Sequence, residues 1–372
     1  MAAEPDLDRL RQLVTDLMMI PGLSGYEGRV RRRIASELNA LGIGSRTDRL
    51  GNLIATLGGN NASPSVMLFA HMDQLGFIVR KIEASGLIRV ERLGGVPERA
   101  LPSQAVLLCI EEGKDVPGII ANKSHHATAP DEKYRVLPYP ELYIDAGLRS
   151  AEEVVSAGID IGTPVVYAPK TITMAGKRIA GTSLDDRAGC AVMIEAARRL
   201  KTIGRRPNVH LVFSVQEEFN LRGAVTAAQA LKPDIAIQLD IILATDTPDM
   251  TARGDVRLGG GPAMSLYSFH GRGTLNGTIP HPALVQLMTA TAREENLTLQ
   301  RSAHVGALTD SSYVQLVHEG VAAIDLGFPT RYTHSSLEMC DLGDIEELTR
   351  LTAASIAGIE EGFSLNRDDH SQ

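Results

Sequence analysis

Acidic residues and histidines follow or interrupt several strongly apolar segments of this sequence. His71 and Asp73 come directly after the apolar run 66–70, and their H-x-D spacing puts both side chains on one face of an extended segment. A carboxylate in that position can hold the second ring nitrogen of a metal-binding histidine. Taken alone the pattern is weak, because a histidine after a buried strand is more often a hydrogen-bonded core or loop residue.

Two pairs of neighbouring carboxylates are the next feature. Asp185 and Asp186 stand immediately before a predicted helix, where aspartate is also favoured as a cap, so a structural and a functional interpretation both stay open. Glu217 and Glu218 follow the apolar run 209–215. Two adjacent carboxylates repel each other and lose hydration on burial, so a cation or bulk water must offset that cost. Because adjacent strand residues point in opposite directions, one glutamate can bind a metal while the other acts as a base.

Asp240 and His334 complete the set of candidate residues. Asp240 is the only charged residue in the apolar run 235–242, and a lone carboxylate is rarely buried without a charged partner. His334 comes shortly after another apolar run, 321–326. Sites in open α/β sheets form at the carboxyl ends of the strands, so we expect these side chains to meet at one edge.

Such a cluster predicts a metal centre. Two histidines and three carboxylates form a mixed nitrogen and oxygen ligand set, which suits zinc, cobalt or manganese and not a thiolate-binding metal. Five ligands are too many for one open catalytic zinc and too few for two separate ions. A carboxylate that bridges two ions about 3.5–4 Å apart resolves the count.

The composition is that of an ordinary globular protein, with 44% hydrophobic and 22% charged residues, and 372 residues suggest two domains. A net charge of −8 argues against a nucleic-acid partner. No apolar run reaches the roughly 18 residues of a membrane helix, so we expect no membrane association. The N-terminus lacks a basic region followed by an apolar one, and the three cysteines form no C-x-x-C pair. We therefore expect no secretory signal and a reducing, cytoplasmic location.

Helices and strands alternate in the predicted elements near both ends of the chain. Apolar spacing predicts helices over 6–19, 30–41, 187–200, from 223, 283–294 and 345–363, and strands over 52–57, 66–70, 209–215, 235–242 and 321–326. Ser24 and Glu27 have the S-x-x-E spacing of a capping box before the second helix. Alternation of this kind predicts an α/β sheet with helices on both faces.

The middle of the chain has a different texture. Short runs of β character, separated by glycine, proline and charged turns, lie at 77–79, 87–90, 105–110, 117–120, 142–144 and 164–167, with one short helix near 150–157. Many short strands with turn signals predict a small β-barrel or sandwich. We therefore expect an α/β domain of residues 1–75 and 172–372, interrupted by an inserted β domain of residues 76–171.

A set of short motifs covers nearly the whole chain and comprises the PGLSGYE segment at 21–27, AHMD at 70–73, LYIDAG at 142–147, LDDR at 184–187, VQEE at 215–218, DTP at 246–248, TD at 309–310 and RYTHS at 331–335. In this order the motifs resemble those of the dinuclear metallo-aminopeptidases of peptidase family M42. This family includes the tetrahedral TET-type enzymes, glutamyl and deblocking aminopeptidases, and proteins labelled cellulase M. Each motif is short, but the ordered set is specific.

The resemblance implies an aminopeptidase that releases N-terminal residues from short peptides, using a water bridged between two divalent metal ions. One ion would be held by His71, Asp185 and Asp240. The second would be held by Asp185, Glu218 and His334, so that Asp185 bridges the two. The ions implied are Zn²⁺, with Co²⁺ or Mn²⁺ as alternatives.

Two further roles and an assembly follow from the same resemblance. Asp73 would orient the ring of His71, and Glu217 would be the general base that takes a proton from the water. The implied fold is a zinc-exopeptidase-like α/β domain whose inserted β-barrel serves in dimerisation. Homodimers would build to a possible tetrahedral dodecamer that encloses its active sites.

The sequence departs from the family pattern at two positions. Gln74 stands where a glutamate is usual, and Asn220 stands where a glycine commonly lies. Neither is a predicted ligand, and asparagine tolerates the left-handed conformation that a glycine adopts. The departures leave the choice of substrate open. His125 and His126, in the inserted domain, are not expected in this chain's metal site, and a role in a neighbouring subunit's site stays open.

Other functions remain as alternatives. A related dinuclear carboxypeptidase or N-acyl amino-acid deacylase would share the ligands and would add an arginine that binds the substrate carboxylate. A glycosidase needs two carboxyl groups about 5–9.5 Å apart, which leaves the two histidines without a reason, and aromatic residues are only 4% of the chain. A metal-stabilised assembly protein without turnover would have no need of a base such as Glu217.

Overall fold

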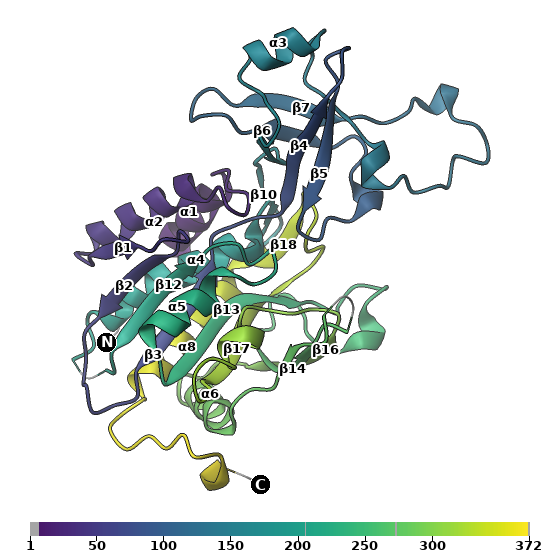
Figure 1. The fold of residues 1–372 in the computed structure, drawn as a ribbon. Coiled ribbons are helices and arrows are strands. Elements are labelled where there is room, and N and C mark those ends of the chain that lie inside the picture. The colour runs from purple at the N-terminus through teal and green to yellow at the C-terminus, as the bar shows by residue number, and fades with distance from the viewer. Residues whose placement is uncertain (1–6, 205, 272–273, 371–372) are drawn as a thin grey trace.

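The computed structural model describes residues 7–204, 206–271 and 274–370, so the first residue of the predicted N-terminal helix lies outside the described part. A mixed sheet with helices on both faces forms the larger body, and a closed barrel stands at one end of it (Figure 1). The predicted fold class, an α/β body with an inserted β-barrel, is confirmed. Within the described ranges, no helix is long and apolar enough to cross a membrane.

The central sheet has nine strands. Their order is β1 (Ser45–Thr47), β2 (Leu53–Leu57), β12 (Val209–Ser214), β3 (Val66–His71), β13 (Ile235–Leu243), β17 (Ala322–Thr330), β14 (Ala263–Phe269) and β15 (Gly277–Thr278), with β16 (Gln300–Val305) paired to β14. The four central strands β12, β3, β13 and β17 are parallel, while β2 and β14 flank them in the antiparallel direction. The carboxyl ends of the four parallel strands therefore meet at one edge.

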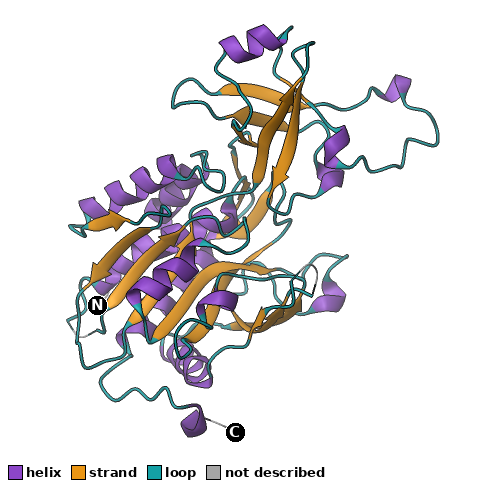
Figure 2. Cartoon of the chain, in the orientation of Figure 1, coloured by secondary structure: helices purple, strands orange, loops and turns teal. Residues whose placement is uncertain are grey.

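Both faces of the central strands are covered by helices (Figure 2). On one face the core contains residues of α1 (Leu7–Met18), α2 (Gly28–Ala40), α4 (Leu184–Leu200), α6 (Pro282–Glu294) and α8 (Leu342–Ala357). On the other face it contains residues of α5 (Gly223–Leu231) and α7 (Ser311–Val314). Side chains of β3 alternate accordingly, with Leu68 in the first core and Met67 and Phe69 in the second. This alternation explains why β3 is apolar throughout.

The barrel has a core of its own. Its strands are β4 (Gly76–Ile82), β5 (Ile88–Leu93), β6 (Ala105–Leu108), β7 (Val116–Ile120), β8 (Ile144–Asp145) and β9 (Pro164–Tyr167), closed in the order β4–β5–β8–β7–β6–β9. Phe77, Val106 and Val165 are among the side chains that fill it. Each barrel strand overlaps one of the six predicted runs, and the predicted short helix is α3 (Ala151–Ser156).

Several elements differ from the prediction. β14 and β16 were not predicted, and neither was the small sheet of β10 (Thr171–Thr173), β11 (Arg178–Gly181) and β18 (Glu338–Asp341). The capping box is wrong, because α2 has no side-chain cap hydrogen bond. Ser24 and Glu27 instead turn towards the carboxyl edge of the sheet, where their oxygens bond to other segments.

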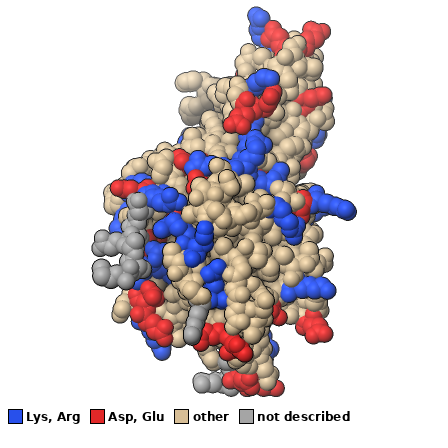
Figure 3. Space-filling view, turned by 90° about the vertical axis from the view of Figure 1, so that its left-hand side faces the viewer, with Lys and Arg blue, Asp and Glu red and all other residues tan. Residues whose placement is uncertain are grey.

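An ion pair joins the barrel to the larger body. The guanidinium of Arg29, in α2, donates from both terminal nitrogens to the carboxylate of Asp115, in the loop before β7, and both side chains are largely buried. Arg32, one turn further along α2, makes a looser pair with Glu112 at 3.3 Å, and both of its members are exposed. On the face that carries α1 and α2, basic side chains gather across the middle of the molecule with acidic ones beside them (Figure 3). The basic residues Arg29 and Arg32 of α2 are therefore used for ion pairing with acidic residues of the barrel domain.

These two pairs give a matched test of what holds the barrel in place. Replacing Arg29 with alanine (Arg29→Ala) leaves a largely buried Asp115 carboxylate without its cation, and we expect a loss of about 1–2 kcal/mol in the free energy of unfolding. Arg32→Ala removes an exposed, solvent-screened pair and should change stability little. Denaturant titration measures both, and equal effects of the two variants would contradict the importance of the Arg29 contact.

Candidate metal centre

Five side chains from five different segments converge at the carboxyl edge of the sheet. The ligand atoms of His71, Asp185 and Asp240 all lie within 4.8 Å of one another. So do those of Asp185, Glu218 and His334, which makes Asp185 common to both groups. His71 ends β3, Asp240 lies within β13 and not at its end, and Asp185 begins α4. Glu218 and His334 follow β12 and β17.

The carboxylate of Asp185 faces both groups with different oxygens. Its Oδ1 lies 3.0 Å from Nε2 of His71, and its Oδ2 lies 3.6 Å from Nε2 of His334. Nε2 of His334 is also 3.6 Å from Oε1 of Glu218. Each group therefore offers one imidazole nitrogen and carboxylate oxygens from two residues. The donor set fits a pair of divalent ions that prefer mixed nitrogen and oxygen ligands and share one carboxylate.

Both histidine rings are oriented through their other nitrogen. Nδ1 of His71 donates to the carbonyl oxygen of Asp73 at 3.1 Å and lies 3.5 Å from its carboxylate Oδ1. Nδ1 of His334 donates to the carbonyl oxygen of Gly95 at 2.9 Å. Because Nδ1 is used in both rings, Nε2 is left to face the centre, as metal-binding histidines require. Gly95 follows β5, so the barrel helps to build the site.

The centre holds more buried negative charge than its own cations balance. Burial raises the pKa of Glu218 to about 7 and the pKa of Glu338, aided by the charge of Asp185, to about 8. Burial also holds the pKa of Asp240 well above its usual range. Burial alone would lower the pKa of His334, but the charges of Glu218 and Asp185 raise it to about 9. Each shift has the direction expected when carboxylates are gathered in a water-poor site where a cation is required.

Glu217 belongs to neither ligand group. It is buried and lines a cavity of about 650 Å³ beside the centre, together with Asp185, Glu218 and Asp240. Burial raises the pKa of Glu217 well above the usual value of a glutamate, and the nearby charge of Glu218 acts in the same direction. A carboxylate with a raised pKa beside a metal pair is suited to accept and return a proton.

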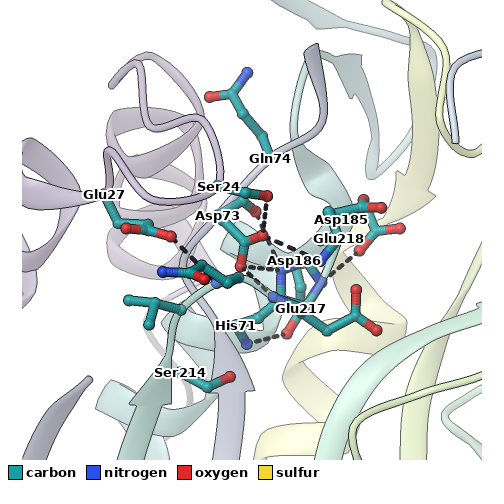
Figure 4. Close-up of polar contacts among 12 residues, drawn as sticks. Ser24, Glu27, His71, Asp73, Gln74, Asp185, Asp186, Ser214, Glu217 and Glu218 are labelled. Carbon is teal, nitrogen blue, oxygen red and sulfur yellow. Dashed lines mark hydrogen bonds and ion pairs between the residues drawn. The ribbon is translucent and has the colours of Figure 1, made fainter. Parts of the chain in front are cut away.

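A buried carboxylate holds the turn that carries Glu217 and Glu218. Oδ1 of Asp73 accepts from the backbone N–H of Glu217 at 3.0 Å, and its Oδ2 accepts from the N–H of Glu218 at 3.1 Å and from Oγ of Ser24 at 2.5 Å (Figure 4). Burial would raise the pKa of Asp73, but its contacts with His71 and these donors hold the pKa below its usual range. Asp73 therefore positions the His71 ring and the glutamate turn together.

Glu27 holds Gln216, the residue before Glu217, in a similar way. Its Oε1 accepts from the backbone N–H of Gln216 at 3.2 Å and from that of Gly25 at 2.7 Å. Gln216 has a φ of 57°, a left-handed conformation that a glutamine adopts at a cost. Three consecutive N–H groups, of residues 216–218, are thus held by two buried carboxylates that come from the N-terminal part of the chain.

Glu338 and Asp186 also hold residues of the centre in place. The sequence did not reveal Glu338 as a candidate, and it left the role of Asp186 open. Glu338 accepts from the backbone N–H of Asp185 at 3.0 Å and from that of His334 at 2.8 Å, so one carboxylate holds two ligand residues. Asp186 accepts from the N–H of Gly189 at 3.1 Å, as a helix cap does, and from the N–H of His71 at 3.2 Å. The capping interpretation therefore applies to Asp186, while Asp185 faces the centre. Glu338 was not predicted because it lies outside the apolar runs that marked the other candidate residues.

Neither departure from the family pattern belongs to a ligand group, and Asn220 lines the cavity beside the centre. Oε1 of Gln74 accepts from the N–H of Gly22 and from the guanidinium of the buried Arg187, each at 3.1 Å. Asn220 has a φ of 71°, the left-handed conformation that was expected of it. His125 and His126 lie in an exposed turn of the barrel and belong to neither ligand group of this chain.

Comparisons with known proteins identify the family and the fold of this chain. The family model for M42 glutamyl aminopeptidases matches residues 51–351. SgcX of Escherichia coli is 36% identical to the chain over 94% of each protein. Among solved structures, an aminopeptidase of the archaeon Desulfurococcus kamchatkensis superimposes with a TM-score of 0.89 at 31% identity, over 96% of this chain and 97% of that one. The TET1 peptidase of Pyrococcus horikoshii, which can assemble into a tetrahedron or a large octahedral shell, has a TM-score of 0.83 at 28% identity, over 93% and 99%.

The support from Glu27 can be tested through metal retention. Glu27→Ala leaves the N–H of Gln216 unpaired and loosens the turn that carries Glu218, so we expect a loss of about 10–100-fold in metal affinity, the usual effect of removing an outer-shell partner. Glu27→Gln keeps an accepting oxygen and should retain most of that affinity. Competition with a chromogenic chelator measures both variants, and unchanged metal affinity in Glu27→Ala would contradict the positioning role.

Proposed function

This chain belongs to the M42 glutamyl aminopeptidase family and is a metal-dependent aminopeptidase, and on that premise we propose that it releases N-terminal residues from short peptides at the centre around Asp185. The observation that supports this most directly is that one carboxylate faces two ligand groups with its two oxygens. A dinuclear hydrolase needs such a bridge.

The proposed centre holds two divalent ions. His71, Asp185 and Asp240 would hold one, and Asp185, Glu218 and His334 the other. Zinc is the ion we expect, with cobalt or manganese as alternatives, because nitrogen and oxygen ligands suit all three. When bound, the ions would lower the pKa of water and polarise the scissile carbonyl.

The remaining chemistry falls to side chains of this chain. Glu217 takes a proton from the attacking water and delivers it to the leaving amine, which its raised pKa favours. Asp73 keeps the ring of His71 turned to the centre and holds Glu217 at its backbone N–H.

The alternative functions are not favoured. A carboxypeptidase or deacylase needs a cation for the substrate carboxylate, yet none of the described residues that line the cavity is a lysine or an arginine. A glycosidase has no use for the two histidines of the centre. A protein that used metal only for assembly would have no reason to keep a buried base such as Glu217 beside the ligands.

We further propose that the chain works as an assembly of copies, in the cytoplasm. Residues 1–75 and 172–372 form the catalytic domain, and residues 76–171 form the domain through which two copies pair. Tyr134, Val136 and Ile119 of that domain are exposed, Tyr134 by 86%, and are suited to a contact between copies. The shells formed by the related Pyrococcus horikoshii peptidase support pairing that continues to a tetrahedral dodecamer. All three cysteines are free, in keeping with a reducing compartment.

Metal-reconstituted turnover tests the proposed function. The protein is stripped with a chelator, supplied with zinc, cobalt or manganese, and assayed on aminoacyl-anilides beside N-blocked and C-terminal peptide substrates. We expect metal-dependent release of free N-terminal residues. Activity restricted to N-blocked or C-terminal substrates would overturn the aminopeptidase assignment.

The role of Glu217 is tested by replacing it with glutamine. Glu217→Gln keeps the size of the side chain but cannot accept the proton, so we expect turnover to fall by about 10²–10⁴-fold while both metal ions still bind. Glu152→Gln, an exposed position on α3, is the matched control and should leave turnover unchanged. Metal content measured by atomic spectroscopy separates the two effects. Normal turnover in Glu217→Gln would remove this residue from its role.

A further inference from the structure

The cavity beside the metal centre continues across the sheet to a second polar end. Glu217 and Asp240 line it near the centre, and Ser265, Ser302 and Asp325 line it on β14, β16 and β17. Neighbouring residues of the same strands, such as Leu239 and Ile324, point into the core on the opposite face. The cavity therefore lies on the face of the sheet that carries α5 and α7.

Strand pairing fixes where Asp325 stands relative to the metal centre. Asp325 pairs directly with Gln238 of β13 on one side and with Ser265 of β14 on the other, and Ser265 pairs with Ser302 of β16. Directly paired residues share a face of the sheet, and Asp240 shares that face because it lies two residues after Gln238. With strands about 4.8 Å apart and about 3.3 Å per residue, Asp325 lies roughly 8 Å from Asp240.

Asp325 has an oxygen that makes no close hydrogen bond within the described part of the chain. The residue is 2% exposed. Its Oδ2 accepts from Oγ1 of Thr309 at 2.9 Å, whereas its Oδ1 is buried, makes no close hydrogen bond and has only the uncharged hydroxyl of Ser311 near the carboxylate. A buried carboxylate oxygen without a donor is unfavourable, and burial correspondingly raises the pKa of Asp325. A cationic group at this end of the cavity would supply what is missing.

The rest of the lining suits a long side chain with a positive end. Ile242, Leu243 and Leu308 give the cavity apolar surface as well. Lysine and arginine place an apolar stem along such a surface and keep a charged head beyond it. None of the described lining residues is a lysine or an arginine. An acidic side chain would therefore be repelled by the carboxylate of Asp325, and the basic groups among the described lining residues are the imidazoles of His270, His304 and His334.

We propose that this end of the cavity receives the side chain of the substrate's N-terminal residue, and that Asp325 selects a basic residue, lysine or arginine. The inference rests on the proposed aminopeptidase function and names the substrate class for the same site. Asp325 acts as a specificity-determining residue, because its carboxylate donates no proton and binds no metal in the reaction. Ser265 and Ser302 extend the polar end beside it.

The test compares matched substrates on the metal-loaded full-length protein. Lysyl- and methionyl-anilides have side chains of similar length that differ in charge, and glutamyl- and glutaminyl-anilides form a second pair. We expect kcat/KM to be at least about tenfold higher for lysine than for methionine, and higher for glutamine than for glutamate. Asp325→Asn keeps an oxygen for the hydroxyl of Thr309 but removes the charge. It should lower kcat/KM for the lysyl substrate by roughly 10–100-fold, the range for one charged hydrogen bond, and leave the methionyl substrate within about twofold.

Two further measurements keep the result unambiguous. Asp8→Asn removes the same charge from an exposed position on α1 and should change neither substrate. Binding is followed separately from turnover, by the rise in Tm that lysinamide and norleucinamide produce. Lysinamide should raise the Tm more in the unaltered chain, and Asp325→Asn should remove that difference.

Three outcomes would count against these assignments in different ways. Equal loss on lysyl and methionyl substrates in Asp325→Asn would show that Asp325 supports the structure and does not select the substrate. Faster hydrolysis of the glutamyl than of the glutaminyl substrate would overturn the proposed selectivity directly. Inactivity on every substrate with metal bound would overturn the proposed function instead, and the lysinamide comparison would still decide whether Asp325 selects a cation.

Discussion

Repulsion among buried carboxylates is the constraint on which the rest of this structure depends. Asp185, Glu218, Asp240 and Glu338 are brought together at the carboxyl edge of one sheet, and burial raises the pKa of the last three. In water such groups would separate, and in a folded protein only cations or dense hydrogen bonding can keep them together. The two groups of ligand atoms that share Asp185 are where we propose that those cations bind. A metal-dependent aminopeptidase meets that electrostatic requirement, because the metal ions that its activity needs also balance the buried carboxylates.

The fold meets the constraint by dividing the acidic residues between two tasks. Some face the centre, while Asp73, Glu27 and Glu338 accept hydrogen bonds from the backbone N–H groups of the ligand-bearing turns. These supports come from segments far apart in the chain, including the loop before α2 and the strand β18. The barrel contributes through the carbonyl of Gly95, so the inserted domain is part of the site as well as a separate body. Precise orientation of the ligands is thereby built into the tertiary structure.

Much of this was predictable from the sequence, and the exceptions have physical reasons. The parallel strands were predictable because they are apolar runs, and the barrel strands were predictable because they are short runs between glycine and proline turns. Asp240 stood out because it is a lone charge in such a run. β16 was missed because its polar, partly exposed residues give no apolar signal, and Glu338 because β18 is short and lies next to polar residues. The Ser24–Glu27 box failed because local spacing cannot reveal that these side chains bond across the fold to the carboxylate of Asp73 and to the N–H of Gln216.

The central claim is that Asp185 joins two metal ions, and anomalous scattering from crystals of the zinc- or cobalt-loaded protein tests it most directly. The account predicts two anomalous peaks about 3.5–4 Å apart, with Asp185 in contact with both. His71 and Asp240 should complete one coordination sphere, and Glu218 and His334 the other. A single peak, or peaks that Asp185 does not connect, would contradict the dinuclear centre from which the proposed mechanism follows.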